Sequence, residues 1–126
     1  MRHEAWLLWL CGMHSLGFAL FHMGFWKWFG WPATLRTTGA ATRAVTQILN
    51  LRLIYVFLGV AGLCFFFPDE LVHTRLGRVV MAGMSLFWVG RLIEQFVFLR
   101  INRWPVHALS VSFALGAVLF AAPLRF

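Results

Sequence analysis

Apolar residues occur along the chain in four long stretches, which are separated by short segments rich in proline, glycine and charged residues. A helix needs about 20 mainly apolar residues to cross roughly 30 Å of hydrocarbon. The stretches reach that length, and we predict membrane-spanning helices over residues 4–26, 44–67, 79–99 and 105–122. Because the connecting segments are short, we expect a single domain over residues 1–126, an all-α, up-down-up-down bundle of four transmembrane helices.

The breaks between the stretches coincide with residues that end or begin helices. Pro32 opens a polar segment rich in Thr, Gly and Ala, and Pro68 ends the second stretch. Asp69 and Glu70 follow, and acidic residues favour a helix N-terminus. We expect residues 71–78 to extend the third helix beyond the membrane as a short amphipathic turn.

Composition supports a membrane location for this chain. Of its 126 residues, 61% are hydrophobic and 12% are charged, and the mean hydropathy is +0.78. Soluble domains carry about 25% charged residues, so this chain has too little polar surface to cover a water-soluble core. The same composition excludes a disordered chain and a disulfide-stapled secreted module.

The net charge of +7 does not indicate a nucleic-acid partner. The basic residues flank the apolar stretches instead of forming one face, as in loops held at lipid headgroups. The loop 27–43 and the turn 100–103 carry five basic residues, and the side of the two termini carries four. The positive-inside rule therefore places the loop 27–43 in the cytoplasm and both termini opposite.

Glu4 makes a poor signal-peptide n-region, which favours a retained anchor.

The third stretch contains polar residues that a membrane span normally excludes. Charged groups at the centre of a span cost about 2.5–3.5 kcal/mol each. Arg91, Glu94 and Gln95 are spaced three and four residues apart, which predicts one shared helix face. That cost is tolerable if the face points into the bundle, so we expect Arg91 and Glu94 to form a buried pair.

The rise of about 1.5 Å per helical residue places polar groups from all four predicted helices at one depth, in the leaflet nearer the loop 27–43. We interpret this layer as a binding site. Its candidate residues are His22, Gln47, Asn50, Arg52, Arg91, Glu94, Gln95 and His107. Arg52 points away from Asn50 around its helix and is included as a further donor. His14 lies near the middle of the first stretch, where a backbone carbonyl is its alternative partner.

The leading functional hypothesis is that the layer binds or transports an amphiphilic, anionic molecule. Arg91, Arg52 and the histidines would donate hydrogen bonds to a carboxylate or phosphate. The apolar part of the ligand is expected to contact Phe18, Trp88 or Phe98.

Three other classes of function fit the same residues. A haem b carrier would use His22 and His107 as axial ligands. A membrane enzyme acting on a lipid-soluble substrate would use His22 and Glu94 as acid and base, with Arg91 stabilising charge. An accessory subunit of a membrane complex would use the polar layer only to dock its helices.

Small residues also predict assembly in the membrane. We expect a homo-oligomer or a larger membrane complex, with membrane lipid as a further partner, because small residues allow close helix packing. The residues that suggest this are Gly59, Gly62, Gly83, Gly90, Ser112 and Gly116.

Cys11 and Cys64 lie within apolar stretches without a metal-binding spacing, and we interpret them as packing residues.

Overall fold

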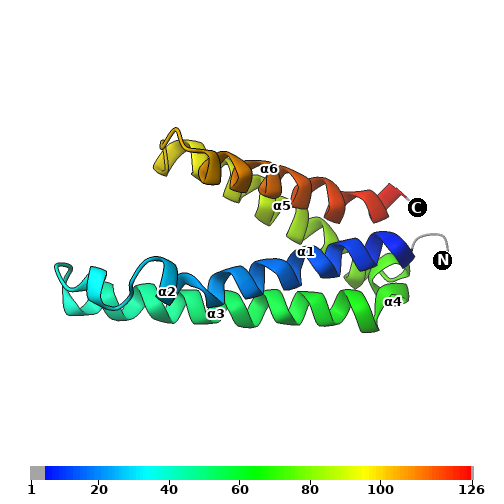
Figure 1. Cartoon of the computed structure of the whole chain (residues 1–126). Helices are drawn as coiled ribbons and strands as arrows, with labels where there is room; N and C mark the ends of the chain where they lie inside the picture. The colour runs from blue at the N-terminus through cyan, green and yellow to red at the C-terminus, as the bar shows by residue number, and fades with distance from the viewer. Residues whose placement is uncertain (1–4, 126) are drawn as a thin grey trace.

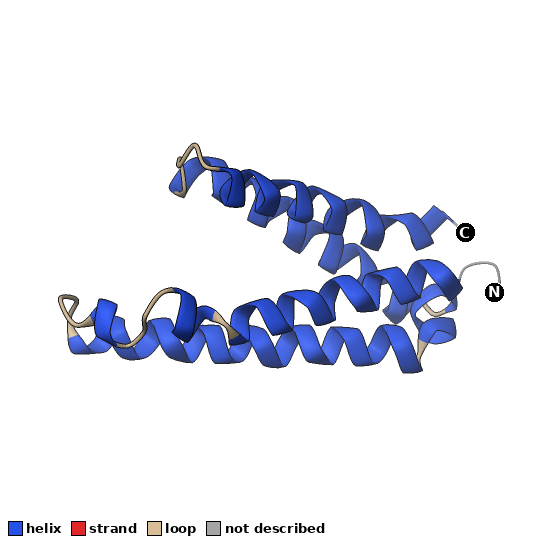
Figure 2. Cartoon of the chain, viewed as in Figure 1, coloured by secondary structure: helices blue, strands red, loops and turns tan. Residues whose placement is uncertain are grey.

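The computed structural model describes residues 5–125, whose regular structure is entirely helical (Figure 2). The long helices are α1 (Ala5–Met23), α3 (Ala40–Phe66), α5 (Arg75–Phe98) and α6 (Trp104–Ala121), which the 3-10 turn η3 (Ala122–Arg125) extends. All four are long and apolar enough to cross a membrane, as the sequence predicts. The predicted start of the first stretch at Glu4 lies outside the described residues.

Short helices connect the long ones. Between α1 and α3 lie α2 (Phe25–Trp28) and η2 (Ala33–Leu35), and between α3 and α5 lies α4 (Pro68–His73). The continuous extension expected over residues 71–78 is wrong, because Thr74 has extended backbone angles (φ −97°, ψ 155°) that separate α4 from α5. The Thr74 hydroxyl accepts a hydrogen bond of 2.9 Å from the Gly77 N–H and thereby caps α5.

The four long helices form two hairpins that meet at one end and diverge at the other (Figure 1). Helices α1 and α3 pack against each other along their length, and so do α5 and α6. The hairpins approach each other at the end that holds α4 and both ends of the described chain, and they separate toward α2 and the α5–α6 turn (Figure 1). The shape is therefore a V rather than an evenly packed bundle.

The core lies where the two hairpins meet. Trp88 is buried between Phe57 and Phe113, with a ring-centroid distance of 5.6 Å to each and nearly parallel ring planes. Cys11 and Cys64 are buried and not joined in a disulfide. Their burial agrees with the interpretation of both as packing residues.

The outward surface of the hairpins is rich in large apolar side chains. Among those exposed are Trp6, Trp9, Leu20, Phe66, Leu76, Leu86, Phe96 and Trp104. Four of the predicted packing glycines leave open space at the position of a Cβ atom, namely Gly59, Gly62, Gly83 and Gly90.

Gly116 serves a different purpose from these four glycines. It is buried, and a Cβ atom there would lie 2.7 Å from His14 Cε1 and 2.8 Å from Trp88 Cγ. The expectation that it belongs to an outward packing stripe is therefore wrong. Gly116 lets the two rings approach the backbone of α6 inside the chain.

Candidate functional site

A cavity of about 410 Å³ lies between the diverging hairpins. Its size is within the range of about 300–1,000 Å³ that is usual for small-molecule sites. Most of its wall is aromatic and comes from Phe18, Phe21, Phe25, Phe29, Trp31, Phe57, Phe87, Trp88 and Phe113. Its polar lining comes from His22, Thr46, Asn50 and Arg91. Three of the eight predicted site residues thus meet in one cavity.

Arg91 brings a positive charge into this aromatic cavity. Its side chain is half-buried, and the guanidinium carbon lies 4.6 Å from the centroid of the Phe113 ring. Within residues 5–125, no protein oxygen hydrogen-bonds this guanidinium. A guanidinium offers five N–H donors, so the cavity presents a cation whose donors are unused.

Glu94 does not share the inward face of Arg91. Glu94 is exposed, whereas its neighbour Gln95 retains 1% of its accessible surface. Consecutive helical residues are about 100° apart around the axis, so turning Gln95 inward turns Glu94 outward. The expected buried pair of Arg91 and Glu94 is wrong, since no ion pair joins them in the described part of the chain.

His22 lies at the end of α1 and lines the cavity. Its Nδ1 is 2.7 Å from the Phe18 carbonyl oxygen. A carbonyl only accepts hydrogen bonds, so Nδ1 carries the proton of the neutral ring and Nε2 holds a lone pair. Neutral His22 accepts a hydrogen bond from a hydroxyl or an acid, and protonated His22 donates one to an anion.

Asn50 holds the end of α1 against α3. Helix α1 ends at Met23, so its last carbonyls need partners from outside the helix. The buried Asn50 supplies one, because its Nδ2 donates a hydrogen bond of 2.9 Å to the His22 carbonyl. Asn50 thereby fixes the backbone that carries His22 while also lining the cavity.

Gln47 supports the same corner but does not line the cavity. Its Oε1 accepts a hydrogen bond of 3.0 Å from Trp26 Nε1, and its Nε2 donates one of 3.1 Å to the Arg43 carbonyl. Both ends of the amide are therefore used within the protein. In this structure Gln47, which the sequence predicts as a ligand-binding residue, joins α2 to α3.

Arg52 also lies away from the cavity. It is exposed, and its guanidinium carbon lies 5.6 Å from the Tyr55 ring centroid on the outside of α3. Two residues correspond to about 200° of rotation around a helix, so Arg52 lies opposite Asn50. Arg52 therefore does not line the cavity with Asn50.

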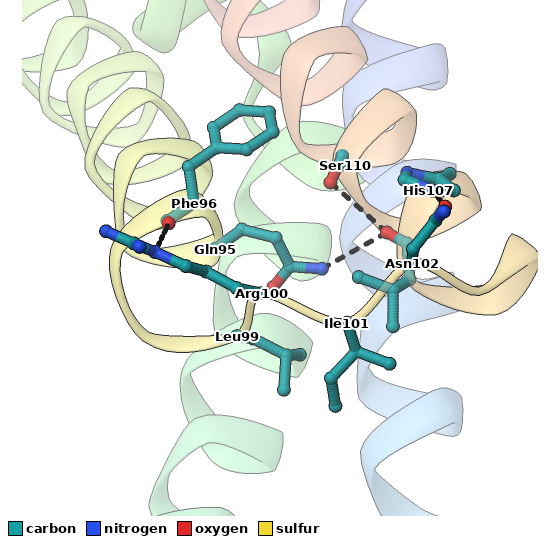
Figure 3. A pocket seen from close by; sticks show the side chains of 9 residues that line it. Gln95, Phe96, Leu99, Arg100, Ile101, Asn102, His107 and Ser110 are labelled. Carbon is teal, nitrogen blue, oxygen red and sulfur yellow. Dashed lines mark hydrogen bonds between the residues drawn. The ribbon is translucent and has the colours of Figure 1, made fainter.

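Gln95 and His107 line a second, smaller pocket of about 220 Å³ at the α5–α6 turn (Figure 3). The Val106 carbonyl accepts hydrogen bonds from Gln95 Nε2 (3.2 Å) and Ser110 Oγ (3.1 Å). His107 Nε2 donates a hydrogen bond of 2.8 Å to Asn102 Oδ1. The predicted layer is therefore divided: three of its eight residues line the cavity, two line this pocket, and Gln47, Arg52 and Glu94 line neither.

This division bears on the haem hypothesis. His22 lines the cavity between the hairpins, whereas His107 is exposed and lines the pocket at the turn. The two imidazoles do not face a common space, and Nε2 of His107 is engaged by Asn102. A haem held by this pair does not fit the structure.

Two of the three apolar residues expected to contact a ligand lie at the cavity. Phe18 and Trp88 line the cavity, whereas Phe98 is 82% exposed. His14 has the carbonyl partner considered for it, since its Nε2 lies 2.9 Å from the backbone carbonyl oxygen of Ser112. Sequence reasoning missed the other phenylalanines of the cavity wall from α1 and α2, namely Phe21, Phe25 and Phe29. Phenylalanines at such spacing are common in aromatic-rich membrane helices, so the pattern did not single them out.

Comparisons with protein families, curated proteins and solved structures gave no match to this chain. Its function is therefore argued from its own residues.

Proposed function

We propose that this chain is a membrane-spanning protein that binds or transports an amphiphile with an oxyanion headgroup, in the cavity between its two hairpins. The carboxylate or phosphate of the ligand would lie at Arg91 and His22. Its apolar body would lie among the aromatic side chains.

The main support for the proposal is the Arg91 guanidinium, which lies in the cavity without a hydrogen-bonding partner among the described residues. Its guanidinium lines an apolar cavity and receives no hydrogen-bonding partner from residues 5–125. A charged group at membrane depth is costly unless it is paired. An oxyanion would supply the missing acceptors through charge-assisted hydrogen bonds, which are about twice as strong as neutral ones.

The four long apolar helices and the exposed apolar surface support the membrane location. We propose that the helices cross the bilayer alternately up and down, with the loop 27–43 in the cytoplasm and the cavity in the leaflet on that side. The open space at Gly59 and Gly83 supports assembly with a second copy or a larger complex.

An accessory role in a membrane complex is the second candidate function. The exposed apolar side chains and open glycines favour it, because they offer surface for a partner helix. The enzymatic hypothesis is weaker, since Glu94, its expected acid or base, is exposed outside the cavity.

Three single-chain probes test the proposed ligand chemistry. Oleate carries a carboxylate, lysophosphatidate carries a phosphate, and monooleoylglycerol has the same chain without a charge. Native mass spectrometry of the protein in mild detergent would measure binding of each. A hydrogen bond to a charged group contributes about 1.5–3 kcal/mol, so the anions should bind about tenfold or more tightly than the neutral probe.

The Arg91→Gln variant should lose this preference for anions while keeping its thermal stability. Arg52→Gln is the matched control, because it removes the same charge from a residue outside the cavity. Equal binding of neutral and anionic probes to the parent chain would contradict the proposal. An equal loss of preference in both variants would show that the effect is not specific to the cavity.

A further inference from the structure

An open groove of about 250 Å³ lies between α1 and α6, the two helices that face each other across the hairpins. From α1 it is lined by Met13, His14, Gly17, Phe18 and Phe21, and from α6 by Leu109 and Ser112. None of these residues carries a carboxylate, a guanidinium or an ammonium group. The groove is therefore suited to an apolar chain rather than to a charged headgroup.

The groove and the cavity share part of their walls. Phe18, Phe21 and Leu109 line both of them. Phe21 and Leu109 are only partly buried and pack against the core from its edge. Phe18 is buried in the core, so rotation about the side-chain bonds of Phe21 and Leu109 would be what connects the two spaces without unfolding a helix.

Gly17 keeps the groove open at the surface of α1. No heavy atom outside its own helix backbone lies within 4 Å of the position that a Cβ atom would take there. At about 1.5 Å of rise per residue, Gly17 is about 7–8 Å along α1 from His22, on the side of the membrane centre. During passage through the groove, the acyl chain would thus point toward the bilayer interior while the headgroup reaches His22.

We infer that this groove is a lateral gateway, through which a single-chain amphiphile passes from the bilayer into the cavity. The inference rests on the proposed function and deepens it, because it names a membrane-dissolved ligand instead of a water-soluble one. The cavity, at about 410 Å³, is near the lower end of small-molecule sites. That size favours a fatty acid or a lysolipid over a lipid with two acyl chains.

Gly17→Leu tests the gateway because the position of a Cβ atom there is open, so the substitution places a larger side chain at a residue that lines the groove. The protein is first loaded with oleate in mild detergent and then mixed with deuterated oleate. Native mass spectrometry follows replacement of one by the other. We expect at least tenfold slower exchange in Gly17→Leu, with the occupancy at equilibrium unchanged.

Gly59→Leu is the matched control. Gly59 also has open space at its Cβ position and lines a separate groove on α3, which shares no residue with the cavity. This variant should exchange oleate at the rate of the parent chain. Leu109→Ala removes part of the shared wall and should accelerate exchange, which provides a test in the opposite direction if Gly17→Leu fails to fold.

The possible failures are distinguishable. A parent chain that binds neither oleate nor lysophosphatidate overturns the proposed function together with the gateway, and if it binds only lysophosphatidate the exchange is measured with that probe. A parent chain that binds oleate through Arg91, with exchange unaltered in both Gly17→Leu and Leu109→Ala, overturns the gateway alone. Loss of equilibrium occupancy in Gly17→Leu also overturns it, because the groove would then be part of the binding site itself.

Discussion

Two arginines of the same helix, Arg78 and Arg91, have opposite surroundings. Both lie on α5, and both are half-buried. The Arg78 guanidinium donates hydrogen bonds to the carbonyls of Val72 (3.2 Å) and Leu124. The Arg91 guanidinium lies over the Phe113 ring in the cavity, and no protein oxygen of residues 5–125 accepts its N–H groups.

The difference follows from where helices end. Near Arg78, α4 ends at His73 and the 3-10 turn η3 ends at Arg125. Helix ends expose carbonyls that have no partner within the helix. Near Arg91, α5 and α6 are continuous, so their carbonyls are used within the helices and the walls are aromatic. An arginine at the closed end of the V is therefore structural, whereas one at the open end is available to a ligand.

The largest effect is expected at the closed end, for Gly77→Ala. A Cβ atom at Gly77 would lie 2.1 Å from the Glu70 carbonyl oxygen and 2.5 Å from Leu71 Cα. Both are backbone atoms, so no side-chain rotation relieves the overlap. We expect a loss of about 3 kcal/mol or more in the free energy of unfolding, at the upper end of overpacking effects, measured by thermal melting in detergent.

Gly90→Ala is the control for this prediction. Gly90 lies on the same helix with open space at its Cβ position. Alanine is the better helix former by about 1 kcal/mol, so this variant should melt at or above the temperature of the parent chain. Equal melting of the two variants would show that the α4–α5 corner is not tightly packed.

The second prediction compares the two arginines directly. Arg78→Met should lower stability by about 2–4 kcal/mol, because it removes hydrogen bonds from a charged group and leaves two carbonyls without donors. Arg91→Met should cost less than about 1 kcal/mol, the size of a cation–π contact.

Adding oleate should change the melting temperatures of the two arginine variants differently. The ligand should raise the melting temperature of the parent chain and of Arg78→Met, through its binding to the folded state. It should not raise that of Arg91→Met. A larger loss of stability for Arg91→Met than for Arg78→Met would contradict the assignment of the two roles.

The sequence predicts the four apolar helices because length and hydropathy decide them locally. Pro68 marks the end of α3 correctly because a proline disfavours helical backbone angles in the residue before it. The V shape does not follow from such patterns. It depends on how the surfaces of α1 and α6 meet, and on a corner at Thr74 and Gly77 that only the packing of α4 on α5 reveals.

For the site, the position of a residue along its helix was predictable, and the direction of its side chain was less so. The helical rise places His22, Asn50 and Arg91 at one level, and the structure brings these three into one cavity. The rise gives no distance across the bundle, so it could not show that His107 lies in the pocket of the α5–α6 turn. Residues three or four apart share a helix face only approximately. For this reason the sequence pattern predicted Glu94 on the inward face, whereas it is exposed.

The smallest effect is expected for Glu94→Leu, which sharpens the contrast between inward and outward positions at the open end. Glu94 is exposed, so the substitution should change the free energy of unfolding by no more than about 0.5 kcal/mol. Its neighbour Gln95 is the comparison, because it is buried and donates to the Val106 carbonyl. Gln95→Leu should cost about 1 kcal/mol, the net contribution of one hydrogen bond. Thermal melting of both variants checks the order, and a larger loss for Glu94→Leu would return Glu94 to the interior as a partner of Arg91.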